Sequence, residues 1–215
     1  FTYVAGTFNG LQDGANQGDD LLYGARLAYN FLNVESNPGY YTSSTYFGKA
    51  GDIFTVAAAI QSQQDGAGTE ADPADFTGWT IDLLSETVFE GAGVLTFEAE
   101  YKDFDTDLND AALASPDCFC LFSGEAGMAT LLFLFPQEIG IGQLQPYVSY
   151  TKNDPDYSED RDNYEVGINY IIDGHNARVA LFYDYGDIAT KGLNYTPSAS
   201  GENVNAISVG VQLQL

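Results

Sequence analysis

Apolar and polar residues alternate along most of this chain, and a period of two predicts β-strands whose two faces meet different surroundings. The clearest example is the stretch 203–215, NVNAISVGVQLQL, in which Ile207, Val209 and Val211 share one face with two leucines. Serine, glycine and glutamine occupy the opposite face. Because the alternation continues to the last residue instead of fading, we expect this strand to be paired along its whole length.

The same pattern recurs in segments of about ten residues, the length that a tilted strand needs to cross a bilayer. We predict ten strands, at residues 1–9, 21–32, 52–63, 75–88, 94–103, 128–135, 143–152, 163–172, 177–186 and 203–215. A strand in hydrocarbon must have every backbone group paired, so we expect an all-β, antiparallel transmembrane β-barrel that occupies residues 1–215 as a single domain. The alternative is a soluble β-sandwich, whose strands are usually shorter and whose loops are less asymmetric.

The connections between these strands alternate in length. Those after the first, third, fifth, seventh and ninth strands are long and acidic, whereas those after the fourth, sixth and eighth are short and that after the second is intermediate. Outer-membrane barrels have long extracellular loops and short periplasmic turns. We therefore predict external loops centred on Asp65, Asp110, Asp156 and Thr196, and periplasmic turns at Gly91 and Gly174.

The two faces of the strands predict two surfaces. The apolar face should meet lipid, at Phe97, Leu181 and Val209 among other residues. Segment 128–135, MATLLFLF, is apolar on both faces, so its inner face must meet something other than bulk water. We expect a loop to fold in against it, and the longest connection, 104–127, is the best candidate.

Composition adds a strong charge asymmetry. The 215 residues include 31 Asp plus Glu against 7 Lys plus Arg, for a formal net charge of -24. Such a chain lacks the basic surface that nucleic acid requires, which excludes nucleic acid as a partner. No apolar run is long enough for a transmembrane helix. The N-terminal stretch has neither a basic region nor a cleavage site, which indicates a mature end or an internal cut.

Seven segments, taken in order, carry a family resemblance. They are FTYVAGTFNG (1–10), NPGYYTSSTYFGK (37–49), DFTGWTIDLLSE (75–86), GAGVLTFEAEYKDFD (91–105), QLQPYVSY (143–150), YEVGINYIIDGHNARVALFYDY (164–185) and VGVQLQL (209–215). The chain resembles the C-terminal part of the phosphate-selective porin O and P family. This resemblance implies a sixteen-stranded, typically homotrimeric channel in a bacterial outer membrane, with lipid outside and small ions or solutes in the pore. The ten strands would then be the last ten of sixteen, without the N-terminal strands; a true ten-stranded barrel is the alternative.

The inward charges depart from the family pattern, in which Arg and Lys select phosphate. Alternation places three bases and six acids inside as pore-lining candidates: Arg26, Lys102 and Arg178, and Asp82, Glu86, Glu98, Glu100, Glu165 and Asp184. A carboxylate-rich pore favours cations. Alternatively, these charges pair within the wall, such as Glu98 or Glu100 with Lys102 or Arg178. We expect a passive, cation-preferring channel for small hydrophilic solutes; the competing hypothesis is a non-channel barrel or sandwich with a structural or adhesive role.

Other chemistry finds little support. We expect no catalytic residue and no cofactor, since the only histidine, His175, lies in a predicted tight turn. Residues 154–165 follow the ligand spacing of a calcium loop, but Glu159 stands where glycine is needed and no helices flank the loop, so we assign no metal ligand. Cys118 and Cys120 are too close for an ordinary disulfide, and we expect passive thiols; a strained redox pair or a disulfide to a partner chain is the alternative.

Overall fold

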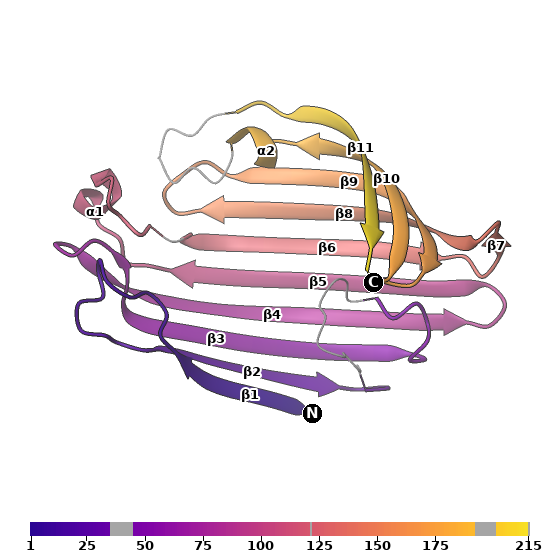
Figure 1. Cartoon of the computed structure of the whole chain (residues 1–215), viewed down its shortest axis with the longest axis horizontal. Helices are drawn as coiled ribbons and strands as arrows, with labels where there is room; N and C mark the ends of the chain where they lie inside the picture. Colours follow the sequence, from indigo (N-terminus) through magenta and orange to yellow (C-terminus); the bar gives the residue numbers. More distant parts are fainter. Residues whose placement is uncertain (35–44, 121, 192–200, 215) are drawn as a thin grey trace.

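The computed structural model describes residues 1–34, 45–120, 122–191 and 201–214, which form one antiparallel sheet (Figure 1). Its strands are β1 (Thr2–Phe8), β2 (Leu22–Asn30), β3 (Ile53–Gly68), β4 (Pro73–Phe89), β5 (Gly93–Asp105), β6 (Gly124–Leu134), β7 (Glu138–Ile139), β8 (Gly142–Pro155), β9 (Arg161–Asp173), β10 (Ala177–Gly186) and β11 (Val204–Leu213). Apart from β7, which pairs only with β8, each strand pairs with its neighbours along the chain. The all-β, antiparallel prediction is therefore confirmed.

Each of the ten predicted strands corresponds to one long strand, and the two-residue β7 is an addition. The predicted bounds are least accurate next to the long connections. β3 runs on to Gly68, and β6 begins at Gly124, four residues before the predicted start. In β6 the backbone pairing continues where the alternation weakens, and Gly124 still lies opposite Phe104. In β3 the register shifts after Gln63, and pairing with β4 resumes at Ala67.

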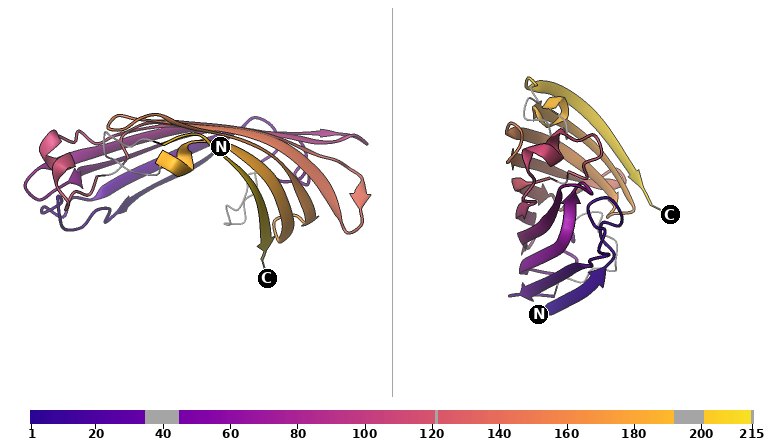
Figure 2. Two further views of the ribbon diagram at one scale, coloured as in Figure 1. Left: turned by 90° about the horizontal axis from the view of Figure 1, so that it is seen from above. Right: turned by 90° about the vertical axis from the view of Figure 1, so that its left-hand side faces the viewer.

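The sheet is strongly curved but open (Figure 2). β1 pairs only with β2 and β11 pairs only with β10, so within the described residues these two strands are free edges. The expected closed barrel is thus not present in this structure. What is present is a trough with one convex and one concave face.

The two ends of the trough differ. The long connections lie at one end, together with the short helices α1 (Asp110–Ala114) and α2 (Ile188–Lys191), and the turns at Gly91 and Gly174 lie at the other end (Figure 1). We call these the loop end and the turn end. Both turn glycines have positive φ, 73° at Gly91 and 49° at Gly174, a conformation that favours glycine. Of the predicted external loop centres, Thr196 lies outside the described residues.

The convex face is apolar and exposed. Val209 is 68%, Leu181 50% and Phe97 37% exposed, and all three lie on the face predicted to meet lipid. An apolar surface that extends over a whole sheet is unusual for a protein surrounded by water. Among the described residues, no helix is long and apolar enough to span a membrane.

The longest connection packs at the loop end, contrary to the expectation that it folds inward. Leu108 and Ala112 of this connection form a small core with Ala67 and Ala74 of the β3–β4 hairpin. A backbone bridge between Gly68 and Phe119 fixes the same contact. The described part of 104–127 therefore covers the β3–β4 hairpin and not the inner face of β6.

The two cysteines of this connection also correct the sequence analysis. Cys118 and Cys120 form a disulfide, although only one residue separates them. Their Cα atoms lie 5.2 Å apart, within the ordinary range for a disulfide. The expectation of passive thiols is wrong in this structure, because the local backbone turns enough to bring the two side chains together. The half-buried pair packs against the small core around Ala67 and Leu108.

Candidate functional site

The candidate site is the concave face, where the polar side of each strand points. One row of facing residues crosses the sheet from β5 to β10, and each member lies opposite the next in register: Glu98, Thr130, Ser149, Glu165 and Asp184. All nine residues predicted from alternation as pore-lining lie on this face. They share this face because the side chains of a strand alternate with a period of two and the register between strands keeps residues of the same face aligned.

Two of the three bases on this face are paired within the wall. Arg26 of β2 makes a two-pronged ion pair with Asp82 of β4, in which Nη2 donates to Oδ1 at 2.8 Å. Lys102 of β5 pairs with Glu100, two residues away on the same strand. The alternative of intramural pairing is therefore correct for Lys102 and Glu100. Arg178 makes no ion pair with any described residue.

A short segment of the β2–β3 connection, residues 45–51, lies across the concave face at the turn end, and we call it the inner segment. Phe47 packs against a small core formed by Val94 of β5, Leu134 of β6 and Ile171 of β9. This contact covers Leu134, at the turn end of the inner face of β6. A folded-in loop was expected there, but it comes from the second connection and not from the fifth.

Glu86 of β4 anchors the inner segment. Its side chain is fully buried and accepts four hydrogen bonds. Oε1 accepts from the backbone N–H of Gly48 at 2.6 Å, while Oε2 accepts from the hydroxyls of Thr45 and Thr96 at 2.9 Å and from the N–H of Tyr46 at 3.1 Å. A buried carboxylate is tolerated when donors surround it in this way. Glu86 is thus a structural anchor and is not open to a solute.

The β9–β10 turn also holds the inner segment. His175 lies in that turn, as predicted, with its Nε2 2.9 Å from the carbonyl oxygen of Thr45 and its ring packed on Phe47 at 4.9 Å between centroids. Phe47 and Gly48 both have positive φ, 56° and 75°. A phenylalanine in that region is uncommon and requires support from its surroundings. The surrounding core and the Glu86 hydrogen bonds provide that support.

The concave face also contains a hollow of about 520 Å³ between β5 and β11. Its polar lining consists of Glu98, Thr130, Tyr147, Ser149, Glu165, Asn169, Arg178 and Gln212. Three of the nine predicted residues are therefore brought together here. The tyrosine hydroxyl donates a hydrogen bond to Glu165, which fixes that carboxylate against the wall. The volume lies in the range of small-molecule sites.

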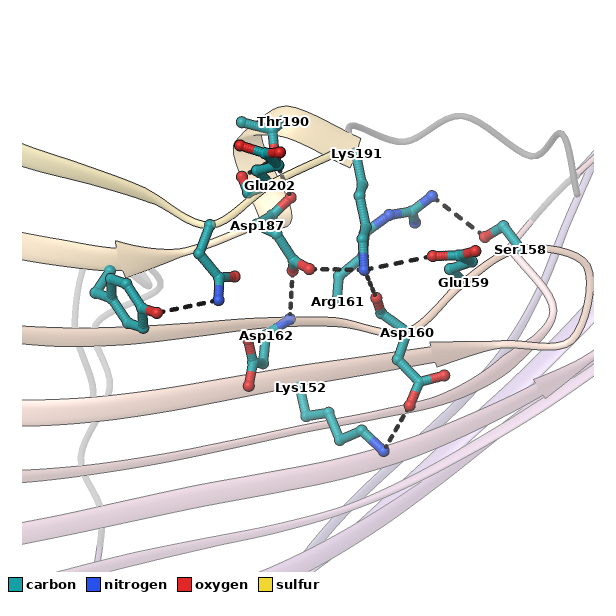
Figure 3. A network of polar contacts seen from close by, with 12 residues as sticks. Lys152, Ser158, Glu159, Asp160, Arg161, Asp162, Asp187, Thr190, Lys191 and Glu202 are labelled. Atoms are coloured by element: carbon teal, nitrogen blue, oxygen red, sulfur yellow. Dashed lines mark hydrogen bonds and ion pairs between the residues drawn. The ribbon is translucent and has the colours of Figure 1, made fainter. Parts of the chain in front are cut away.

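A second polar cluster lies at the loop end (Figure 3). The ammonium group of Lys191, in α2, donates to the carbonyl oxygen of Asp160 at 2.6 Å and pairs with Asp187 at 2.6 Å. Asp187 in turn accepts from the backbone N–H of Asp162 at 2.9 Å. This cluster ties the end of β10 to the β8–β9 loop.

Acidic residues in 154–165, whose spacing resembles that of a calcium loop, contact a lysine in the structure. The ammonium group of Lys152 lies between Asp154 and Asp160, at 3.2 and 3.3 Å. The pKa of the Asp160 carboxyl is lowered by hydrogen bonding with Asp154 and with Lys152. Within the described residues, no three His, Cys, Asp or Glu side chains are arranged to hold a metal ion.

Several residues of the concave face were missed in the sequence analysis. The neutral lining of the hollow, such as Tyr147 and Asn169, follows from the same alternation that placed the charged residues, so the signal was present. The inner segment could not be found in that way, because its anchors, Glu86 and His175, are 89 residues apart in sequence. The fold alone brings β4 and the β9–β10 turn to the same stretch, residues 45–48.

A scan against protein-family models, a search of curated proteins and a search of solved structures found no match to this chain.

Proposed function

We propose that this chain forms the wall of an outer-membrane porin, a passive aqueous channel for small ions and hydrophilic solutes. The observation that carries the proposal is one continuous curved sheet with an exposed apolar convex face and a polar, hollowed concave face. A soluble sheet would bury its apolar face against a second layer. A barrel wall in a membrane has the opposite arrangement, with apolar residues outside and polar residues inside.

Closure is a necessary part of this proposal. The open edges at β1 and β11 expose unpaired backbone groups, which hydrocarbon does not tolerate. In the sixteen-stranded homotrimeric channel implied by the family resemblance, further strands would fill the gap between these two edges. The long connections at one end and the short turns at the other support the orientation predicted from the sequence, with the loop end outside the cell and the turn end in the periplasm.

The charge balance of the concave face supports a preference for cations. Asp82 and Glu100 are neutralised by their partners, and Glu86 is buried beneath the inner segment. Glu98, Glu165, Asp184 and Arg178 remain on this face, so acids still outnumber bases. Carboxylates in a narrow pore concentrate cations there. Glu100 is therefore expected to contribute less to cation preference than the sequence indicated, because the charge of Lys102 neutralises it.

The test is the reversal potential of the purified protein in a planar bilayer under a KCl gradient. We expect cation preference, and Glu98→Gln should reduce it because this carboxylate lines the hollow without an ion-pair partner among the described residues. Glu138→Gln, which changes an exposed residue of the β7 hairpin, is the matched control and should leave the potential unchanged. Failure to conduct would favour the non-channel surface role, and anion preference would refute the charge assignment.

A further inference from the structure

The hollow holds one unsatisfied charge of each sign. Arg178 enters it from β10 and Glu98 from β5, and among the described residues neither has an ion-pair or hydrogen-bond partner. This is in contrast to Arg26 and Lys102, whose charges are cancelled within the wall. A guanidinium group left unpaired on an otherwise acidic surface is available to an anionic group from outside the chain.

The neutral lining between these two charges is held in place by its own hydrogen bonds. The hydroxyls of Thr130 and Ser149 lie 2.8 Å apart, and the Asn169 amide donates to Gln145 at 3.2 Å. The Gln212 amide donates to the carbonyl oxygen of His175 at 2.8 Å, which leaves the Gln212 side-chain oxygen as a free acceptor. The hollow therefore presents a fixed polar wall, and its shape does not depend on a ligand.

We propose that this hollow is a binding station for small dipolar solutes that carry one anionic and one cationic group, such as short peptides with free termini. The inference rests on the proposed channel function. The anionic group would meet Arg178, and the cationic group would meet Glu98, with Glu165 close by. A simple anion would gain only the first contact and face the acidic surroundings, whereas a simple cation would gain only the second and face Arg178.

The experiment compares glycylglycine with two derivatives that each lack one of its end charges, the N-acetyl derivative and the C-terminal amide. Each is added to the protein in a planar bilayer, and the concentration that halves the KCl current is measured. We expect glycylglycine to block at a concentration roughly tenfold lower than either derivative, since each loses one charge-assisted hydrogen bond. Equal blocking by all three would overturn the inference.

Variants assign the two poles of the site. Arg178→Gln should abolish the advantage of glycylglycine over the amide, which has no carboxylate, and Glu98→Gln should abolish its advantage over the N-acetyl derivative, which has no ammonium group. Glu138→Gln is the control, because this exposed residue of β7 does not line the hollow, and it should leave all three concentrations unchanged. An advantage that survives both hollow variants would place the binding elsewhere and overturn the assignment.

The outcomes separate this inference from the function on which it rests. A wild-type protein that conducts KCl but does not distinguish the three probes contradicts the binding station and leaves the channel standing. A wild-type protein that does not conduct overturns the channel and the binding station together. The comparison of probes on the wild-type protein needs no variant, so a folding defect in Arg178→Gln or Glu98→Gln cannot conceal the answer.

Discussion

Glu86 shows how much of this structure one side chain can hold. Its two carboxylate oxygens accept four hydrogen bonds, three of them from the inner segment, and no solvent reaches it. In a closed barrel, this would fix a piece of chain across the passage at the turn end. The residue that appeared to be a selectivity group in the sequence is thus a support for the polypeptide that narrows the concave face.

The isosteric substitution Glu86→Gln tests this role. One oxygen would become an NH₂ group, which cannot accept from Gly48 or from the donors grouped around the other oxygen. We expect a loss of about 1–3 kcal/mol in the free energy of unfolding, the range for unsatisfied buried donors. Denaturant titration in detergent measures it, with exposed Glu90→Gln as the control. If the two variants unfold alike, Glu86 does not anchor the segment.

Gly48 permits a close approach in the same segment. Its φ is 75°, and a Cβ at this position would lie 2.7 Å from a methyl carbon of Val94. Gly91 has φ of 73° but nothing within 4 Å, so Gly91→Ala carries the backbone cost alone. We expect Gly48→Ala to be more destabilising than Gly91→Ala by about 1–3 kcal/mol of overpacking. Thermal or denaturant unfolding of both variants gives the difference, and equal values would mean that the segment can shift.

At the scale of elements, Asp187 connects α2 to the start of β9 in the loop-end cluster, through Lys191 and the backbone of Asp162. Burial acts to raise the pKa of Asp187, but the hydrogen bonds from Lys191 and from the Asp162 backbone lower it below its ordinary value of 3.8. A carboxyl group whose pKa is lowered by folding stabilises the folded state at pH above its unfolded pKa. That contribution is lost as the pH falls through the folded pKa.

Hydrogen exchange of the Asp162 amide, corrected for the intrinsic pH dependence of exchange, can follow this loss. We expect constant protection from neutral pH down to about 4, and a decrease below that value as Asp187 protonates. In Asp187→Asn the step should disappear, because the side chain no longer titrates. A step of the same size in the variant would assign the pH dependence to another carboxyl group, such as Asp160.

At the scale of the whole molecule, the two faces of the curved sheet make the membrane proposal testable. Val209 and Ser208 are neighbours on β11 that point to opposite faces, the first 68% exposed on the convex side. An arginine at mid-depth on a lipid-facing surface costs roughly 2–4 kcal/mol. We expect that loss for Val209→Arg and a much smaller one for Ser208→Arg, measured by unfolding from lipid vesicles. Equal losses would contradict the assignment of faces.

The sequence by itself determined the class of fold, the ten long strands and the face of each side chain. These features depend on local alternation, which the pleat of a β-strand turns directly into two faces. For that reason the charged residues of the concave face, from Arg26 to Asp184, were found without a structure. The alternation of long and short connections was equally visible, because it depends only on positions along the chain.

Only the tertiary structure decided which charges remain available. Whether Arg26 pairs with Asp82, and whether Glu86 faces a solute or a backbone, depends on segments that lie far apart in the sequence. The Cys118–Cys120 disulfide and the inner segment are settled in the same way, since both depend on how the backbone bends. Periodicity specifies the face of the sheet on which each side chain lies. It contains no information about which distant segment that side chain will contact, because this depends on how the whole chain folds.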